Sequence, residues 1–160
     1  MPPSASGSRD ERKSRRVTDP THSLQKRKRD TARAMSQENV DSIKRGFEAW
    51  NRDDFDAWIE QFAPDVEWSA LTEEFRGHAG AHQAWESFKG VVSLTVRFDD
   101  IRDLGESVLA LGEITGTGRT TGLHIGGELA QLFTFRDGKV VRVCDFRSHA
   151  EALEAVGLSE

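Results

Sequence analysis

The stretch that decides the fold is LHIGGELAQLFTFRDGKVVRVCDFRSHAEALEAVGLS, residues 123–159. Two runs rich in β-branched and aromatic residues flank an Asp-Gly pair at positions 137 and 138. Such a pair between alternating apolar runs is the strongest short-range signal for a β-hairpin, because a two-residue type I′ turn needs positive φ at both central residues. We therefore predict a hairpin with strands over 123–135 and 139–147, followed by one terminal helix.

Helices are expected at the start of the domain and strands after them. Apolar residues fall on one helical stripe over residues 40–50, and a second stripe of the same kind covers residues 55–62, up to Pro64. Residues 81–88 predict a third helix. Together these elements predict a cone-shaped α+β fold with a pocket. The further strands are expected over residues 66–70, 93–102 and 107–119.

Two of the predicted strands are apolar on both faces. Leu109 lies opposite Val108 in one of them, and Leu129 lies opposite Ala130 in the next. A strand that is buried on both faces needs two covering layers. Since three helices can cover only one face, we predict that a second copy of the protein covers the other, which gives a twofold-symmetric homodimer.

The composition bounds the class of protein. The chain has 160 residues, 31% of them charged, so its length suits one domain and no apolar run is long enough to cross a bilayer. The N-terminus carries no apolar segment of the kind that directs secretion. We therefore expect a soluble, cytoplasmic protein without membrane contacts.

The N-terminal segment, residues 1–34, differs in charge from the rest. It holds ten Lys or Arg against four acidic residues, whereas residues 35–160 hold twelve against twenty-three. Because the segment has few apolar residues, we expect a disordered basic tail, followed by one folded domain over residues 35–160 that starts with a helix capped by Ser36. We hypothesise that Met35 is the natural start. The acidic domain repels phosphates, so a nucleic-acid partner is not expected.

Acidic residues on the predicted strands are the candidates for catalysis. Removing a proton next to a carbonyl group needs a desolvated carboxylate and a donor for the developing oxyanion. Glu128 is the first choice, because it opens an apolar run whose neighbours on the same face, Ala130 and Leu132, suggest an interior position. Each acid could instead be a solvated or salt-bridged strand residue. The strand acids are Glu67, Glu113, Glu128 and Asp145.

Histidines and tryptophans supply candidate ligand contacts. His78 and His82 stand four residues apart, but the Glu that follows the first His in zinc proteases is absent, so no metal site is expected. His78 is placed instead at the cavity mouth. His124, on a strand, is a candidate acid, base or donor because its ordinary pKa lies near neutrality. Trp68 and Trp85 could stack on a flat ligand.

Several segments, taken in order, resemble the SnoaL-like (polyketide cyclase-like) group of the nuclear transport factor 2-like superfamily. They mark a helix stop, a turn, a hairpin and a final helix, and the resemblance covers about residues 36–158. The segments are FEAWNRDDFDAW (47–58), FAPDVEW (62–68), FRGHAG (75–80), FRDGKVVRV (135–143) and AEALEAVG (150–157).

The resemblance implies an α+β fold in which three N-terminal helices pack on the concave face of a curved, mainly antiparallel sheet, a cystatin-like α+β barrel with a cavity. The superfamily includes cyclases, isomerases, hydrolases and non-catalytic binders. An isomerase-type site is not expected, because Ser69 or Ala70 stands where that group has its Asp base and the chain has no tyrosine.

The expected function is binding of a small hydrophobic, carbonyl-bearing metabolite, with acid-base catalysis of cyclase, isomerase or hydrolase type that needs no cofactor. The alternative is a non-catalytic ligand-binding or dimerisation module. The candidate catalytic residues are Glu128, Asp145 and His124. The candidate substrate-binding residues are Trp68, Trp85, His78, Arg97, Gln131 and Phe133.

Overall fold

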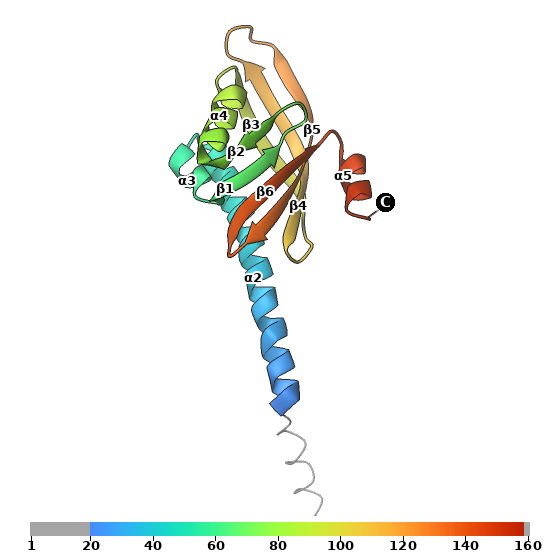
Figure 1. Cartoon of the computed structure of the whole chain (residues 1–160). Helices are drawn as coiled ribbons and strands as arrows, with labels where there is room; N and C mark the ends of the chain where they lie inside the picture. Colours follow the sequence, from blue (N-terminus) through green and yellow to red (C-terminus); the bar gives the residue numbers. More distant parts are fainter. Residues whose placement is uncertain (1–19, 159–160) are drawn as a thin grey trace, which may run out of the picture. The chain divides into compact units, whose positions relative to one another are not determined.

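The structure is a computed structural model that describes residues 20–158. The chain divides into two compact units, residues 1–34 and 35–160. Figure 1 shows the elements in chain order. These are α2 (Pro20–Asn51), α3 (Phe55–Ile59), β1 (Phe62–Ser69), β2 (Glu74–Arg76), α4 (Gly77–Lys89), β3 (Val92–Asp103), β4 (Ser107–Gly118), β5 (His124–Arg136), β6 (Lys139–Phe146) and α5 (His149–Ala155).

The hairpin predicted from the Asp-Gly pair is confirmed. Strands β5 and β6 pair antiparallel up to Arg136 and Lys139, which leaves two residues in the turn. Asp137 has φ 52° and Gly138 has φ 78°, the positive values that a type I′ turn requires at both positions. The terminal helix α5 follows, with the Ser148 hydroxyl accepting a hydrogen bond from the backbone N–H of Glu151 at its N-terminus.

The six strands form one curved, mainly antiparallel sheet in the order β2-β1-β6-β5-β4-β3. Four of the five strand pairs are antiparallel, and β1 runs parallel to β6. This parallel pair brings the first long strand beside the last one, with Trp68 opposite Val143. The predicted α+β class is confirmed.

Helices α2, α3 and α4 cover the inner face of the sheet, as expected. One buried cluster joins Ile43 of α2, Trp58 of α3 and Ala84 of α4 to Val108 and Phe133 of the sheet. Apolar burial of this kind is the main favourable contribution to folding. Figure 1 shows α3 and α4 on one side of the sheet and α5 on the other.

Helix α2 corrects the expected boundaries at the N-terminal end. It begins at Pro20 rather than at Ser36, so residues 20–34 are helical and the disorder expected there is not seen. Pro is well suited to the first turn of a helix, and no Gly or Pro interrupts residues 21–45, which are rich in good helix formers. The part of the expected disordered tail over residues 1–19 lies outside the described residues.

Helix α4 also differs from its expected bounds. It begins at Gly77 and therefore includes both His78 and His82, although Gly80 argued against a helix there. Gly80 has a packing role, because a Cβ at this position would lie 3.0 Å from the backbone of Phe75. The missing side chain lets α4 approach β2, a short strand that the sequence did not indicate.

The outer face of the sheet is covered in part by α5. Ala152 and Leu153 of this helix are buried against Leu109, Leu111 and Ala130 of β4 and β5. The two-sided apolar pattern therefore finds part of its second cover within the same chain, and the homodimer stays a prediction. The remaining outer face holds a shallow depression lined by Ser93, Thr95, Thr115, Gly116, Thr117, His124 and Ile125. No helix within residues 20–158 is long and apolar enough to cross a membrane.

Candidate functional site

A cavity of about 240 Å³ lies between the three helices and the inner face of the sheet. Aromatic side chains make up much of its wall but do not fill it. Three lining residues are exposed, namely Leu71, Glu128 and Arg147, and we call these the mouth. The rest of the lining is Phe47, Trp50, Trp58, Gln61, Phe62, Trp68, Phe88, Leu94, Val96, Ile114, Leu129, Gln131, Phe133, Val143, Asp145 and Phe146.

Asp145 is the carboxylate in this wall. Trp68 Nε1 donates a hydrogen bond of 3.1 Å to Asp145 Oδ1, and Gln131 Nε2 donates one of 2.8 Å to the same oxygen. Oδ2 accepts no hydrogen bond from the described residues. Burial raises the pKa of Asp145 to about 6, against the opposing effect of the two hydrogen bonds. The group can therefore hold or release a proton close to neutral pH.

Strand pairing explains how these three residues meet. Gln131 and Asp145 are direct partners across the antiparallel β5–β6 pair. Trp68 comes from β1, whose parallel pairing with β6 places it beside Val143, two residues before Asp145 on the same strand face. The alternation of strand side chains thus directs the indole, the amide and the carboxylate toward one point of the cavity wall.

Four of the residues named from the sequence come together in the cavity lining. These are Trp68, Gln131, Phe133 and Asp145. Glu128 lies only at the mouth, and its carboxylate is 3.5 Å from Nδ1 of His149 in α5. Its side chain is half exposed, so Glu128 lacks the desolvated setting that made it the first choice as base.

His124 and Arg97 lie outside the cavity lining. His124 is exposed on β5, and its Nδ1 is 3.4 Å from the Thr117 hydroxyl. The Arg97 side chain is 69% exposed and forms ion pairs with Asp99 and Glu113. Alternation along β3 and β5 directs both side chains to the outer face, away from the cavity lining.

His78 and Trp85, both on α4, are not among the residues that line the cavity. His78 Nε2 lies 2.9 Å from the backbone oxygen of Phe62 and so joins α4 to β1. The Trp85 ring packs edge-on against Trp50, with ring centres 4.9 Å apart, behind the cavity wall. The second histidine of the pair, His82, lies 3.3 Å from Glu86 on the surface of α4.

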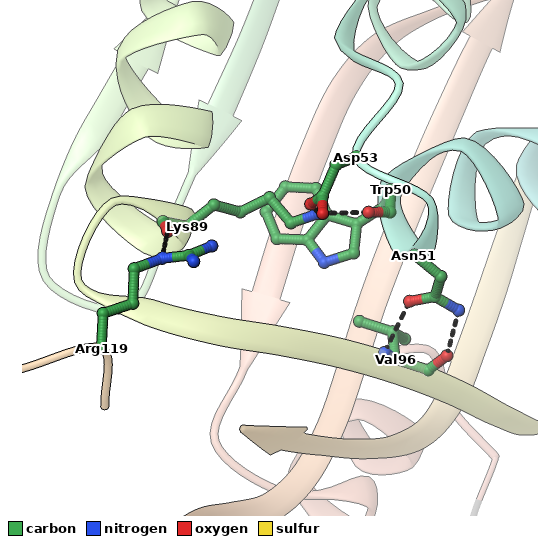
Figure 2. A network of polar contacts seen from close by, with 6 residues as sticks. All are labelled: Trp50, Asn51, Asp53, Lys89, Val96 and Arg119. Atoms are coloured by element: carbon green, nitrogen blue, oxygen red, sulfur yellow. Dashed lines mark hydrogen bonds and ion pairs between the residues drawn. The ribbon is translucent and has the colours of Figure 1, made fainter. Parts of the chain in front are cut away.

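The sequence did not single out the wall formed by Trp50. Figure 2 shows how this residue is held. Lys89 donates hydrogen bonds to the Trp50 backbone oxygen and to Asp53 Oδ1, and its ammonium lies 4.7 Å from the centre of the Trp50 ring and 4.5 Å from that of Trp85. A cation over an aromatic face is attracted by the ring. Arg119 Nε bonds the Lys89 backbone oxygen at 2.7 Å.

Hydrogen bonds of Asn51 also connect the C-terminal end of α2 to the sheet. The Asn51 side chain donates to Val96 O and accepts from Val96 N, both at 2.8 Å, as drawn in Figure 2. Since Val96 belongs to the cavity lining, these bonds fix the wall on the β3 side. An Asn directly after a helical apolar stripe was the available signal, but the sequence does not show which strand it reaches.

Two polar atoms of the wall are left without partners. Trp50 Nε1 and Gln61 Oε1 are buried and, among the described residues, neither finds a hydrogen-bond partner. Each such atom imposes a desolvation cost on the folded protein. Both atoms are enclosed by protein, so they offer no contact to a ligand in this arrangement.

Known proteins share this architecture. The SnoaL-like domain matches residues 43–143, more than half of the chain. No curated protein shows significant sequence similarity to the chain. Solved structures share the fold, and the three described next are all below 25% identity, so they bear on the fold alone.

A putative polyketide cyclase from Xanthomonas campestris pv. campestris is 24% identical, with 69% of this chain and 90% of that one covered and a TM-score of 0.63. An NTF2-like protein of unknown function from Burkholderia pseudomallei is 20% identical, with coverage of 73% and 95% and a TM-score of 0.64. TerC, co-crystallised with polyporic acid, is 20% identical, with coverage of 75% and 98% and a TM-score of 0.63. The chain belongs to the SnoaL-like domain family.

Proposed function

We propose that this protein binds a small, flat, carbonyl-bearing metabolite in the cavity. Asp145 removes a proton from this metabolite and returns it, and the reaction needs no cofactor. The observation that carries the proposal is a carboxylate with a raised pKa and a free oxygen on the wall of an apolar cavity. Perturbed acids in clefts are typical of catalytic sites. A pure binding module of the same fold has no need for this costly placement.

The chemistry follows from the positions of two groups. Asp145 Oδ2 takes a proton from a carbon next to the carbonyl group, the C–H electron pair forms a C=C bond, and the carbonyl oxygen gains negative charge. Gln131 Nε2 carries two hydrogens and uses one for Asp145. The other can donate to the developing oxyanion, which is the stabilisation that such a step requires. Asp145 then returns the proton.

Two fold neighbours support this class of ligand. One is a putative polyketide cyclase, and TerC was crystallised with polyporic acid. The cavity of about 240 Å³ lies just below the range of about 300–1,000 Å³ typical of drug-sized ligands. This size favours a molecule of two fused rings rather than a larger polycycle.

The proposal is tested with 2-tetralone, a flat bicyclic ketone with exchangeable hydrogens next to its carbonyl. In D2O the wild-type protein should accelerate replacement of these hydrogens by deuterium, followed by NMR. Asp145→Asn should reduce the rate by at least about 100-fold, because the base is lost. The wild-type rate should rise with pH through about 6 as Asp145 ionises, and then level off.

Glu128→Gln serves as the matched control, since it removes an exposed carboxylate at the cavity mouth that lies 3.5 Å from His149. This variant should keep the exchange rate within about twofold of wild type. Binding of 2-tetralone with no acceleration of exchange would favour the non-catalytic module. Full activity in the Asp145→Asn variant would contradict the role of Asp145.

We also propose a homodimer through the open part of the outer sheet face. Short hydroxyl side chains line the depression there, and they are flanked by the exposed aliphatic residues Leu123 and Ile125, 67% and 46% exposed. Such apolar side chains beside a shallow polar surface suit a self-complementary contact. Sedimentation equilibrium checks this, and a monomer at micromolar concentration would contradict it.

A further inference from the structure

One cationic side chain stands at the cavity mouth without a protein partner. Arg147 lines the cavity and is exposed, and among the described residues it makes no hydrogen bond or ion pair. Most other arginines of the domain are engaged by a carboxylate or a backbone oxygen. The engaged ones are Arg45, Arg52, Arg76, Arg97, Arg102, Arg119 and Arg136.

The position of Arg147 relates it directly to the proposed base. It follows Asp145 by two residues, directly after β6 ends at Phe146, and both residues line the same cavity. The interior beyond them is apolar, with Val143 and Phe133 on the wall. A guanidinium group is not transferred into such surroundings, so it stays at the mouth. A ligand that reaches Asp145 therefore keeps its outer end beside Arg147.

The charges around the mouth make Arg147 the group that can bind an anion there. Residues 35–160 carry twelve basic against twenty-three acidic side chains, so the domain as a whole repels anions. The carboxylate of Glu128, the other charged group at the mouth, lies 3.5 Å from His149. Arg147 is thus the available cation at the mouth, and a guanidinium matches the two oxygens of a carboxylate.

We propose that Arg147 determines specificity by binding a carboxylate on the outer end of the ligand. This inference rests on the proposed function of the cavity and narrows its ligands. The substrate class is then a small flat carbonyl compound that also bears an acid group. Its apolar body fills the cavity, its reacting carbon lies at Asp145, and its carboxylate stays at the mouth.

The test compares 2-naphthoate with its uncharged methyl ester by isothermal titration calorimetry. The wild-type protein should bind the acid about tenfold more tightly than the ester, as expected for a charge-assisted bidentate contact. Arg147→Gln should abolish this preference while leaving ester binding unchanged. Arg142→Gln is the matched control, because Arg142 is another exposed arginine of β6 that does not line the cavity, and this variant should keep the preference.

The outcomes separate the two proposals. Equal affinity of acid and ester for the wild-type protein, or a preference kept in Arg147→Gln, would overturn the role of Arg147 and leave the cavity function standing. Failure of both probes to bind, together with no exchange of 2-tetralone, would overturn both. Because Arg147 is exposed and unpaired, its replacement should leave the urea midpoint unchanged, which verifies that the variant is folded.

Discussion

Two ionisable side chains lie next to the cavity, Lys89 buried and Asp145 partly buried, and their surroundings differ. Lys89, with a side chain 5% exposed, is surrounded by the Asp53 carboxylate, a backbone oxygen and two indole faces. Asp145 has two neutral donors on one oxygen and, within residues 20–158, no ion-pair partner. The lysine is fully occupied and holds the wall in place. The aspartate keeps an unused oxygen and a raised pKa, which suits it to chemistry.

The largest expected effect is on the free energy of unfolding, which the ionised Asp145 should lower. Its folded pKa of about 6 exceeds the ordinary value of 3.8, so between these pH values the folded chain holds a proton that the unfolded chain releases. Asp145 therefore contributes stability that is present below about pH 4 and lost as the pH rises through about 6. Relative to wild type, Asp145→Asn should gain on the order of 3 kcal/mol between about pH 4 and about pH 7.5. Urea unfolding of both proteins across this range measures the difference, and a constant difference would contradict the raised pKa.

The opposite behaviour is expected of Lys89. Lys89→Met keeps the length of the side chain but leaves the Trp50 backbone oxygen unbonded and removes the cation from both rings. The free energy of unfolding should fall by about 2 kcal/mol at neutral pH. Lys139→Met is the control, since Lys139 also donates to a backbone oxygen, that of Glu60, but on the surface, and it should lose less than about 0.5 kcal/mol. If urea unfolding showed the same loss of unfolding free energy for both variants, the burial of Lys89 would make no contribution to stability.

A smaller effect is expected on the pKa of Asp145 when its hydrogen bond from Trp68 is removed. Trp68→Phe keeps an aromatic ring in the wall but removes the N–H that donates to Oδ1. Since this bond favours the charged form, its loss should raise the pKa of Asp145 further, by up to about one unit. The carboxyl 13C resonance of Asp145, titrated by NMR, reports this directly. Trp85→Phe, which alters an indole outside the cavity lining, should leave the titration unchanged.

The local signals in the sequence were sufficient for most of the fold. The Asp-Gly turn and the long β patterns gave the hairpin and strands β3 to β6, because turn geometry and side-chain alternation act over a few residues. The start of α2 was missed, since good helix formers outside a packed core carry no apolar pattern. The short strand β2 was missed as well, because its three residues are too few for a periodic signal.

The site was predictable only in part. Glu128 was preferred because Ala130 and Leu132 share its face, and that pattern was correct. Ala130 and Leu132, however, are buried against α5 and not against the cavity, and the sequence does not say which cover each face receives. Asp145 was among the candidates, but its raised pKa comes from burial in the folded chain, and its hydrogen-bond partner Trp68 lies 77 residues away along the chain. Local patterns contain no information about such a pairing.

The parallel pairing of β1 with β6 has a consequence for how the protein is made. Trp68 leaves the ribosome long before Asp145 is synthesised. Its indole N–H therefore has no acceptor until most of the sheet has been translated. Contacts so distant along the chain form late and slow folding. A nascent chain released before β6 would lack the proposed base altogether, so the proton transfer proposed for Asp145 would require that translation and folding had both finished.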